Sequence, residues 1–182
     1  MDNPATGTLW TIGHSTRDWE TFLGMLQEAG IQVLADVRRF AGSRRHPQFS
    51  RDVMPHALAH AGIRYLPLPA MGGRRSADPG SRNTAWRVPA FRAYADHMAS
   101  DDYADARARL MAAALAAPTC VMCAEALWWR CHRRLVADDF LSRGWRVLHL
   151  MGPGKAAPHE LHADAVMEGG VLRYPAAQGR LL

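Results

Sequence analysis

The sequence predicts an α/β fold, a three-layer sandwich in which helices cover both faces of a mostly parallel, five-stranded sheet. Short apolar runs typical of buried strands alternate with segments whose apolar residues recur at helical spacing. The intervening segments are long enough for right-handed crossovers between parallel strands. Because 48% of the 182 residues are hydrophobic, we expect one domain over residues 1–182, with its core over about residues 8–165 and a C-terminal tail over 166–182.

Strands and helices alternate through the first half of the chain. Residues 8–13 (TLWTIG) predict a strand, and apolar residues at helical spacing from Trp19 onward predict a helix. We expect Ser15 or Thr16 to cap this helix and Gly30 to end it. The elements expected next are a buried strand over residues 31–37, a basic loop over 38–50, a helix over 54–61 and a strand over 63–68.

The second half begins with a long loop and then returns to the same alternation. Residues 70–87 show no periodicity, and a loop of this length is usually functional or disordered. Pro89 suits the first turn of the next helix. The elements expected next are helices over residues 89–98, 103–116 and 131–143, strands over 119–123 and 146–150, a helix over 159–165 (HELHADA) and an added edge strand over 171–174 (VLRY).

The positive charge of the chain is concentrated in one segment. The formal net charge is +5 and the isoelectric point is about 9.6. Between Arg38 and Arg92 there are eleven arginines and only two aspartates, a surplus of +9, whereas the rest of the chain carries −4. A guanidinium matches a phosphate or carboxylate through two parallel hydrogen bonds, so this cluster predicts an anionic ligand.

Cysteine content and hydropathy predict a cytoplasmic protein without a membrane partner. Three cysteines, an odd number, fit a reducing compartment better than a disulfide framework. No apolar run approaches the ~18 residues of a membrane helix. The N-terminal residues also lack the pattern of a signal peptide.

Ligands of open parallel sheets bind at the carboxyl ends of the strands, so the polar residues that follow the predicted strands should meet there. His14 and Ser15 lie where a helix begins, and backbone N–H groups at such a point favour an anion; capping by Ser15 is the alternative role. The Gly72-Gly73 pair lets backbone approach a ligand. We expect substrate binding by Ser15, Arg17, Asp36, Arg38, Arg39, Ser43, Arg44, Gly72, Gly73, Arg74 and Arg133.

Two cysteines and their polar neighbours form the densest chemical motif. Cys123 ends a predicted strand and Cys131 begins a predicted helix, where the helix dipole and Arg133 favour a thiolate. The alternative is structural, with Cys123 a core residue and Cys131 only a helix-start residue. The candidate catalytic roles are nucleophile for Cys131 or Cys123, acid or base for His14 or His132, and orienting carboxylate for Glu125 or Asp36.

A soft metal site is another use of the same residues. Cys123, Cys131 and His132, with His14, could form a tetrahedral site. However, the C-x7-C spacing differs from the close ligand pairs of zinc sites. The chain also lacks the glycine-rich fingerprints of triphosphate and dinucleotide sites. We therefore predict no cofactor.

Trp128 and Trp129 precede Arg130 and permit two interpretations. The pair could stack on a base beside the guanidinium. Alternatively, one tryptophan belongs to the core and the other covers the cysteine loop.

Seven stretches of the sequence carry a family resemblance: TIGHSTR (11–17), LADVRRFAGSRRHPQF (34–49), GIRYLPLPAMGGRR (62–75), FRAYADHM (91–98), MCAE (122–125), CHRRLVAD (131–138) and HELHADA (159–165). Through them the chain resembles the bacterial and archaeal family of unknown function numbered 488. The resemblance implies an α/β fold and the same strand-end residues. Ala41 and Met71 depart from the family's usual proline and leucine, and neither change removes a polar group. A weaker similarity to the rhodanese superfamily, in Leu34–Arg38 and Val121–Cys123, implies sulfur transfer.

These residues favour an enzyme-like protein that binds a small anion, phosphate- or nucleotide-like, at the carboxyl ends of its strands. Three alternatives remain open. The basic segment over residues 38–92 could bind nucleic acid, the cysteines could transfer sulfur, or the domain could regulate or interact without turnover. No oligomeric state follows from the sequence.

Overall fold

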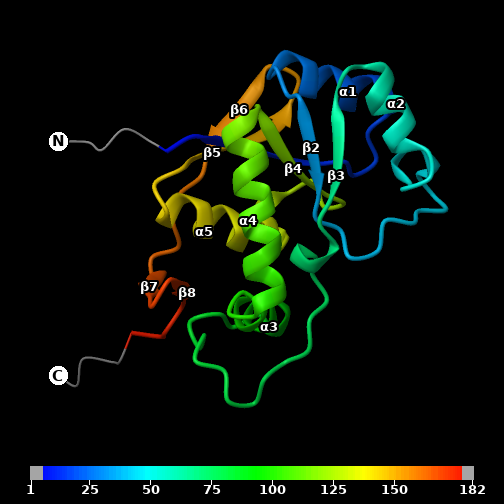
Figure 1. Ribbon diagram of the computed structural model, residues 1–182. Helices are drawn as coiled ribbons and strands as arrows, with labels where there is room; N and C mark the ends of the chain where they lie inside the picture. Colours follow the sequence, from blue (N-terminus) through cyan, green and yellow to red (C-terminus); the bar gives the residue numbers. More distant parts are fainter. Residues whose placement is uncertain (1–5, 178–182) are drawn as a thin grey trace.

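A six-stranded sheet forms the middle layer of the protein (Figure 1). The computed structural model describes residues 6–177. Five strands are parallel, as predicted, and a sixth, antiparallel strand adds an edge that the sequence analysis did not identify. In spatial order the strands are β3 (Arg64–Pro67), β2 (Val33–Asp36), β4 (Thr119–Cys123), β1 (Thr8–Gly13), β5 (Arg146–Gly152) and β6 (Lys155–Pro158).

Helices cover both faces of this sheet, which confirms the three-layer prediction. One apolar cluster joins the strands to α1 and α2, and a second joins them to α3, α4 and α5. Connections between parallel strands cross the first face when the next strand lies nearer β3, and the second face when it lies nearer β6. All of these crossovers therefore have the same handedness, as parallel strands require. The helices are α1 (Trp19–Glu28), α2 (Met54–His60), α3 (Pro89–His97), α4 (Asp101–Ala116) and α5 (Arg133–Ser142).

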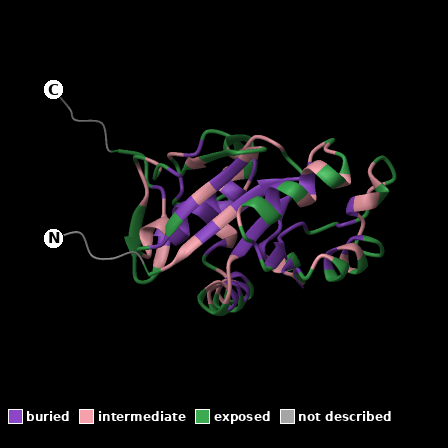
Figure 2. Ribbon diagram, turned by 90° about the horizontal axis from the view of Figure 1, so that it is seen from above, coloured by how far each residue is buried: buried purple, intermediate pink, exposed green. Residues whose placement is uncertain are grey.

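Strand β4 lies in the interior of the sheet between β2 and β1. All of its residues are buried, as expected for a strand covered on both faces, and Figure 2 shows this burial along the central strands. Alternation sends Cys120 toward α1 and α2, whereas Cys123 belongs to the cluster on the opposite face. The strand therefore separates Cys120 from the other two cysteines.

The predicted cap of α1 is wrong. Asp18 is the cap, and its carboxylate accepts a hydrogen bond from Thr21 N–H at 2.7 Å. Ser15 has a φ of 47°, and its N–H donates to the carbonyl of Ala124. This bond ties the loop after β1 to the loop after β4, so the helix begins later than Ser15 or Thr16.

The C-terminal part also differs from the prediction. Residues 159–165 form no helix, because the segment stays irregular where His159 and His162 bond Asp138. The strand expected over residues 171–174 does form, as β8 (Val171–Arg173), but it pairs with β7 (Val166–Glu168) in a separate ribbon. Residues 178–182 of the predicted tail, like residues 1–5 of the predicted domain, lie outside the described residues. Between residues 6 and 177, no helix has both the length and the apolar character needed to cross a membrane.

Candidate functional site

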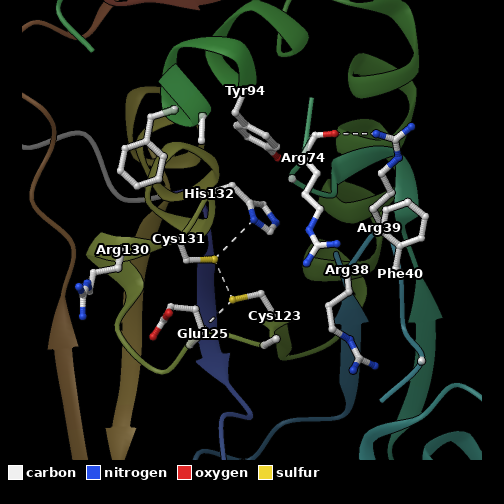
Figure 3. A pocket seen from close by; sticks show the side chains of 15 residues that line it. Arg38, Arg39, Phe40, Arg74, Tyr94, Cys123, Glu125, Arg130, Cys131 and His132 are labelled. Carbon is white, nitrogen blue, oxygen red and sulfur yellow. Dashed lines mark hydrogen bonds between the residues drawn. The ribbon is translucent and has the colours of Figure 1, made fainter. Parts of the chain in front are cut away.

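A cavity of about 410 Å³ lies at the end of β4 (Figure 3). Strands β1 and β2 lie on either side of β4. After β1 and after β2 the chain crosses one face of the sheet, whereas after β4 it crosses the other face. Loops that diverge in this way open a crevice at the strand ends. We call the cavity the cysteine pocket; its lining residues are Arg38, Arg39, Phe40, Gly42, Gly73, Arg74, Ala90, Phe91, Tyr94, Cys123, Ala124, Glu125, Arg130, Cys131 and His132.

The two thiols in this pocket form a close pair. The Sγ atoms of Cys123 and Cys131 lie 2.9 Å apart, and both cysteines are free and almost fully buried. The hydrogen bond with Cys123 holds the pKa of Cys131 well below its ordinary value. Burial raises the pKa of Cys123, whose thiol donates that hydrogen bond. The directions of the two shifts make Cys131 the member of the pair that loses its proton more readily.

The start of α5 supports the Cys131 thiolate. The first residue of the helix, Arg133, directs its backbone N–H toward Cys131 Sγ at 3.5 Å, and His132 Nδ1 lies at the same distance from this sulfur. Cys131 precedes the N-cap, so it lies just outside the helix that was predicted to begin with it. The helix dipole favours negative charge at this position.

The Arg133 side chain fixes the loop between the two cysteines through hydrogen bonds. Its guanidinium donates to the carbonyl oxygens of Glu125 at 2.7 Å and Ala126 at 3.2 Å. Arg133 is buried and does not line the cysteine pocket. Gly13 lies so close to the Glu125 carbonyl that a Cβ atom there would overlap it. Both residues position the loop.

Arginines and an aromatic ring form the opposite side of the pocket. Arg39 donates to the carbonyl of Arg74 at 2.7 Å, and both guanidinium groups lie over the Phe40 ring, at 5.5 and 6.0 Å from its centroid. Arg74 has a φ of 58°. A Cβ atom on Gly73 would lie 3.1 Å from His132 Nδ1, so the glycine permits the close approach of the histidine ring.

Arg38 lines the pocket but is engaged by protein groups. Its guanidinium forms two hydrogen bonds with Asp36, at 2.9 and 2.7 Å, and a third with the Phe49 carbonyl. Its remaining nitrogen lies 3.2 Å from His14 Nε2. Burial lowers the pKa of His14 to about 4, and the ring stacks on Phe49 at 4.4 Å. His14 is thus a neutral ring that accepts from Arg38. Asp36 also accepts from the Tyr65 hydroxyl, and burial with this contact raises the Tyr65 pKa to about 12.

The structure divides the residues proposed from the sequence into two groups. Some of those outside the pocket support its loops: Arg17 donates to the carbonyl of Gly13, and Ser43 accepts from His46 N–H. The residues brought into the pocket are Arg38, Arg39, Gly73, Arg74, Cys123, Glu125, Cys131 and His132. The residues that do not line it are His14, Ser15, Arg17, Asp36, Ser43, Arg44, Gly72 and Arg133.

Sequence reasoning missed several lining residues. Tyr94 lies in the helix predicted over residues 89–98; its hydroxyl donates to the carbonyl of Met71 at 2.6 Å, and its ring borders the pocket. Phe40 is the exposed aromatic side chain in the basic loop. An aromatic residue among arginines was the one signal that could have identified Phe40.

A buried chain of hydrogen bonds leads from the cysteine loop into the protein. Arg133 donates to Thr11 Oγ1 at 3.1 Å, and Thr11 lies 2.6 Å from His149 Nδ1. His149 Nε2 contacts His159 Nδ1 at 3.0 Å, and His159 Nε2 contacts Asp138 at 2.7 Å. Burial lowers the pKa of His149 to about 3, so this ring is neutral. No sequence motif predicts this chain of hydrogen bonds, because its members come from four separate parts of the sequence.

Within residues 6–177 there is no group of three or more histidine, cysteine or acidic residues arranged to hold a metal ion. Fold and site together define an α/β protein with a close pair of buried free cysteines at the carboxyl edge of a mostly parallel sheet. The model of one protein family, described as Domain of unknown function DUF488, matches residues 18–140, more than half of the chain. The protein therefore belongs to the DUF488 family, as its motifs predicted. Comparison with curated proteins and with solved structures gave no match.

Proposed function

We propose that this protein is an enzyme that binds a small anion in the cysteine pocket and attacks it with the Cys131 thiolate. The observation that carries the proposal is the pair of free cysteine sulfurs, 2.9 Å apart, that lines a cavity edged by arginines. A thiolate is the reactive form of cysteine, and a cationic, partly enclosed site favours it. A purely structural cysteine pair needs neither the cavity nor the arginines.

The charges around the cavity support an anionic substrate. Arg39, Arg74 and Arg130 line it, and Glu125 is its one acidic lining residue among those described. The guanidinium of Arg38 is held by Asp36, so it contributes charge and shape more than free donors. The Arg74 guanidinium points into the space between Arg38 and the two cysteines (Figure 3), where it would donate charge-assisted hydrogen bonds to a phosphate-sized group.

In the proposed reaction the Cys131 sulfur forms a bond to the electrophilic centre of the anion, and the leaving group departs with the electrons of the broken bond. His132 is the candidate acid that supplies a proton to this group. Among the described residues its Nε2 atom is buried without a hydrogen-bond partner, a cost that a bound ligand would remove. A water molecule then attacks the same centre, breaks its bond to Cys131 and gives the product, and the released Cys131 thiolate accepts the hydrogen bond of Cys123 again.

Alkylation tests the proposal directly. Iodoacetamide should modify Cys131 near pH 6.5 faster than an ordinary thiol, as mass spectrometry of the labelled peptide would show. Phosphate or sulfate should slow this modification. Arg74→Ala should weaken the protection about tenfold, because it removes one charge-assisted contact, whereas Arg109→Ala, on the exposed side of α4, should not. An unreactive Cys131, or equal reaction with and without anions, would contradict the proposal.

Sulfur transfer is a second candidate, favoured by the short distance between the two sulfurs. Cys131 would attack the outer sulfur of thiosulfate, forming a persulfide and releasing sulfite. Cys123 would then attack Cys131 Sγ, forming a disulfide and releasing hydrosulfide with the Cys123 proton, and an external thiol would reduce the disulfide. One equivalent of sulfite per protein, lost in Cys131→Ser, is the expected result; no sulfite release excludes this reaction.

Nucleic-acid binding by the basic segment has less support. Within residues 38–92, Arg38 binds Asp36, Arg75 donates to three backbone carbonyls and Arg92 donates to the carbonyl of Trp86. These arginines stabilise the fold rather than present a phosphate-binding surface. Binding dominated by phosphate contacts would weaken steeply with salt, so a salt titration distinguishes it from binding in a local pocket.

A further inference from the structure

A second hollow, of about 530 Å³, adjoins the cysteine pocket and shares Phe91 and Arg130 with it. We call it the tryptophan pocket. The two hollows therefore lie next to each other, with Phe91 and Arg130 between them. The lining residues of the tryptophan pocket are Ala85, Trp86, Arg87, Val88, Phe91, Trp129, Arg130, Arg134 and His162.

The two neighbouring tryptophans have different surroundings. Trp128 stacks face to face on His149, with centroids 4.3 Å apart and ring planes at 4°, and so covers the buried hydrogen-bond chain. Trp129 is 42% exposed and lines the tryptophan pocket. An exposed tryptophan makes little contribution to the core. Its large aromatic surface, at the edge of a hollow, is available to a ligand.

The rest of the pocket combines aromatic rings with positive charge. Trp86 is buried, packs edge-on against Phe91 at 5.1 Å and lies under the guanidinium of Arg134, 4.9 Å from its ring centroid. Arg87 and Arg130 also line the hollow, and none of its described lining residues is acidic. Such a surface suits a planar aromatic ring that is joined to a negatively charged group.

We propose that the tryptophan pocket binds the base of a nucleotide whose phosphate is held by Arg130 and the arginines of the cysteine pocket. The proposal rests on the proposed function for its phosphate end and names the substrate class of that site. The base contributes an aromatic face, which stacks on Trp129, and the phosphate accepts from guanidinium groups. The nucleotide is either free or the end of a strand, because both sources present the same ring and phosphate.

Calorimetric titration of the full chain tests this with three probes: AMP, ribose 5-phosphate and a 5′-phosphorylated oligonucleotide. AMP should bind about fivefold to a hundredfold more tightly than ribose 5-phosphate, since base stacking on an aromatic side chain contributes this much. Trp129→Ala should remove the difference and leave ribose 5-phosphate binding unchanged. Trp129→Phe, which keeps an aromatic face, should retain most of it.

Matched variants and the oligonucleotide complete the experiment. Leu115→Ala, which shortens another exposed apolar side chain (62% exposed) on α4, should change neither affinity. Arg74→Ala should weaken AMP and ribose 5-phosphate by the same factor. Oligonucleotide binding that depends on Trp129 identifies a strand end as the source of the base, and binding of AMP alone identifies the free nucleotide.

The two proposals fail in different ways. Equal binding of AMP and ribose 5-phosphate, or an AMP affinity unaffected by Trp129→Ala, overturns the base site while the anion chemistry of Cys131 stands. AMP binding through Trp129 together with an unreactive Cys131 supports the base site and overturns the proposed nucleophile.

Discussion

Replacing Cys123 with alanine should raise the pKa of Cys131 and change its reactivity in opposite directions at low and high pH. The Cys123 thiol is the main cause of the lowered Cys131 pKa, and it acts over 2.9 Å in a buried site. A hydrogen bond to a charged group contributes about 1.5–3 kcal/mol. Its loss corresponds to a roughly 10- to 100-fold change in the ratio of thiolate to thiol.

The rate of alkylation changes less than this ratio, because a thiolate of higher pKa is also a stronger nucleophile. With a Brønsted coefficient of about 0.4–0.5, Cys123→Ala should react ~3- to 10-fold more slowly than the unmodified protein at acid pH. At alkaline pH, where Cys131 is ionised in both proteins, the variant should react faster by a similar factor. The two pH profiles should therefore cross.

Carbamidomethylation of the Cys131 peptide, followed by mass spectrometry across the pH range, measures these profiles. Cys120→Ala is the matched control, because Cys120 lies on the same strand but packs on the opposite face of the sheet. Its profile should coincide with that of the unmodified protein. Coincident profiles for Cys123→Ala and the unmodified protein would refute the assignment of Cys123 as the donor that stabilises the thiolate.

Two further predictions concern stability. Gly13→Ala should lower the free energy of unfolding in urea by about 1–3 kcal/mol and slow Cys131 alkylation, because the new methyl group displaces the Glu125 carbonyl. The control is Gly24→Ala, in α1 with open space around it, which should raise the free energy of unfolding by up to about 1 kcal/mol. A Gly13→Ala protein with unchanged stability would contradict the close packing at Gly13. Burial gives His14 and His149 pKa values of about 4 and 3, below the ordinary 6.5. As the pH falls from about 7 to 4, the unfolded state therefore binds more protons than the folded state, and the free energy of unfolding should fall. The decrease should be on the order of 3 kcal/mol for His14 alone. Urea titrations at several pH values measure this slope, which should become shallower in His149→Gln; an unchanged slope would show that His149 is not neutral in the folded protein.

The sequence was most informative about elements whose formation depends on local pattern. Buried strands require successive apolar residues and helices require apolar residues at helical spacing, so β1 and β4 begin and end at the predicted residues. The placement of Cys123 at a strand end followed directly, because the apolar run stops there. The helix predicted over residues 159–165 does not form, because the conformation of this segment depends on long-range hydrogen bonds to Asp138.

The sequence by itself determined the layers of the fold and the strand-end loops that meet beside Cys123. Only the tertiary structure decided which of their charged groups face the cysteine pocket. Arg38 lines the cavity but is bonded to Asp36, and Arg133 is bonded to the carbonyls of residues 125 and 126 outside the cavity. Arg39 and Arg74 line the cavity without an acidic partner in the part of the chain that the structure describes. The physical reason is that hydrogen bonds are made between groups close in space, and a one-dimensional pattern places a side chain at the site without showing which partner engages it.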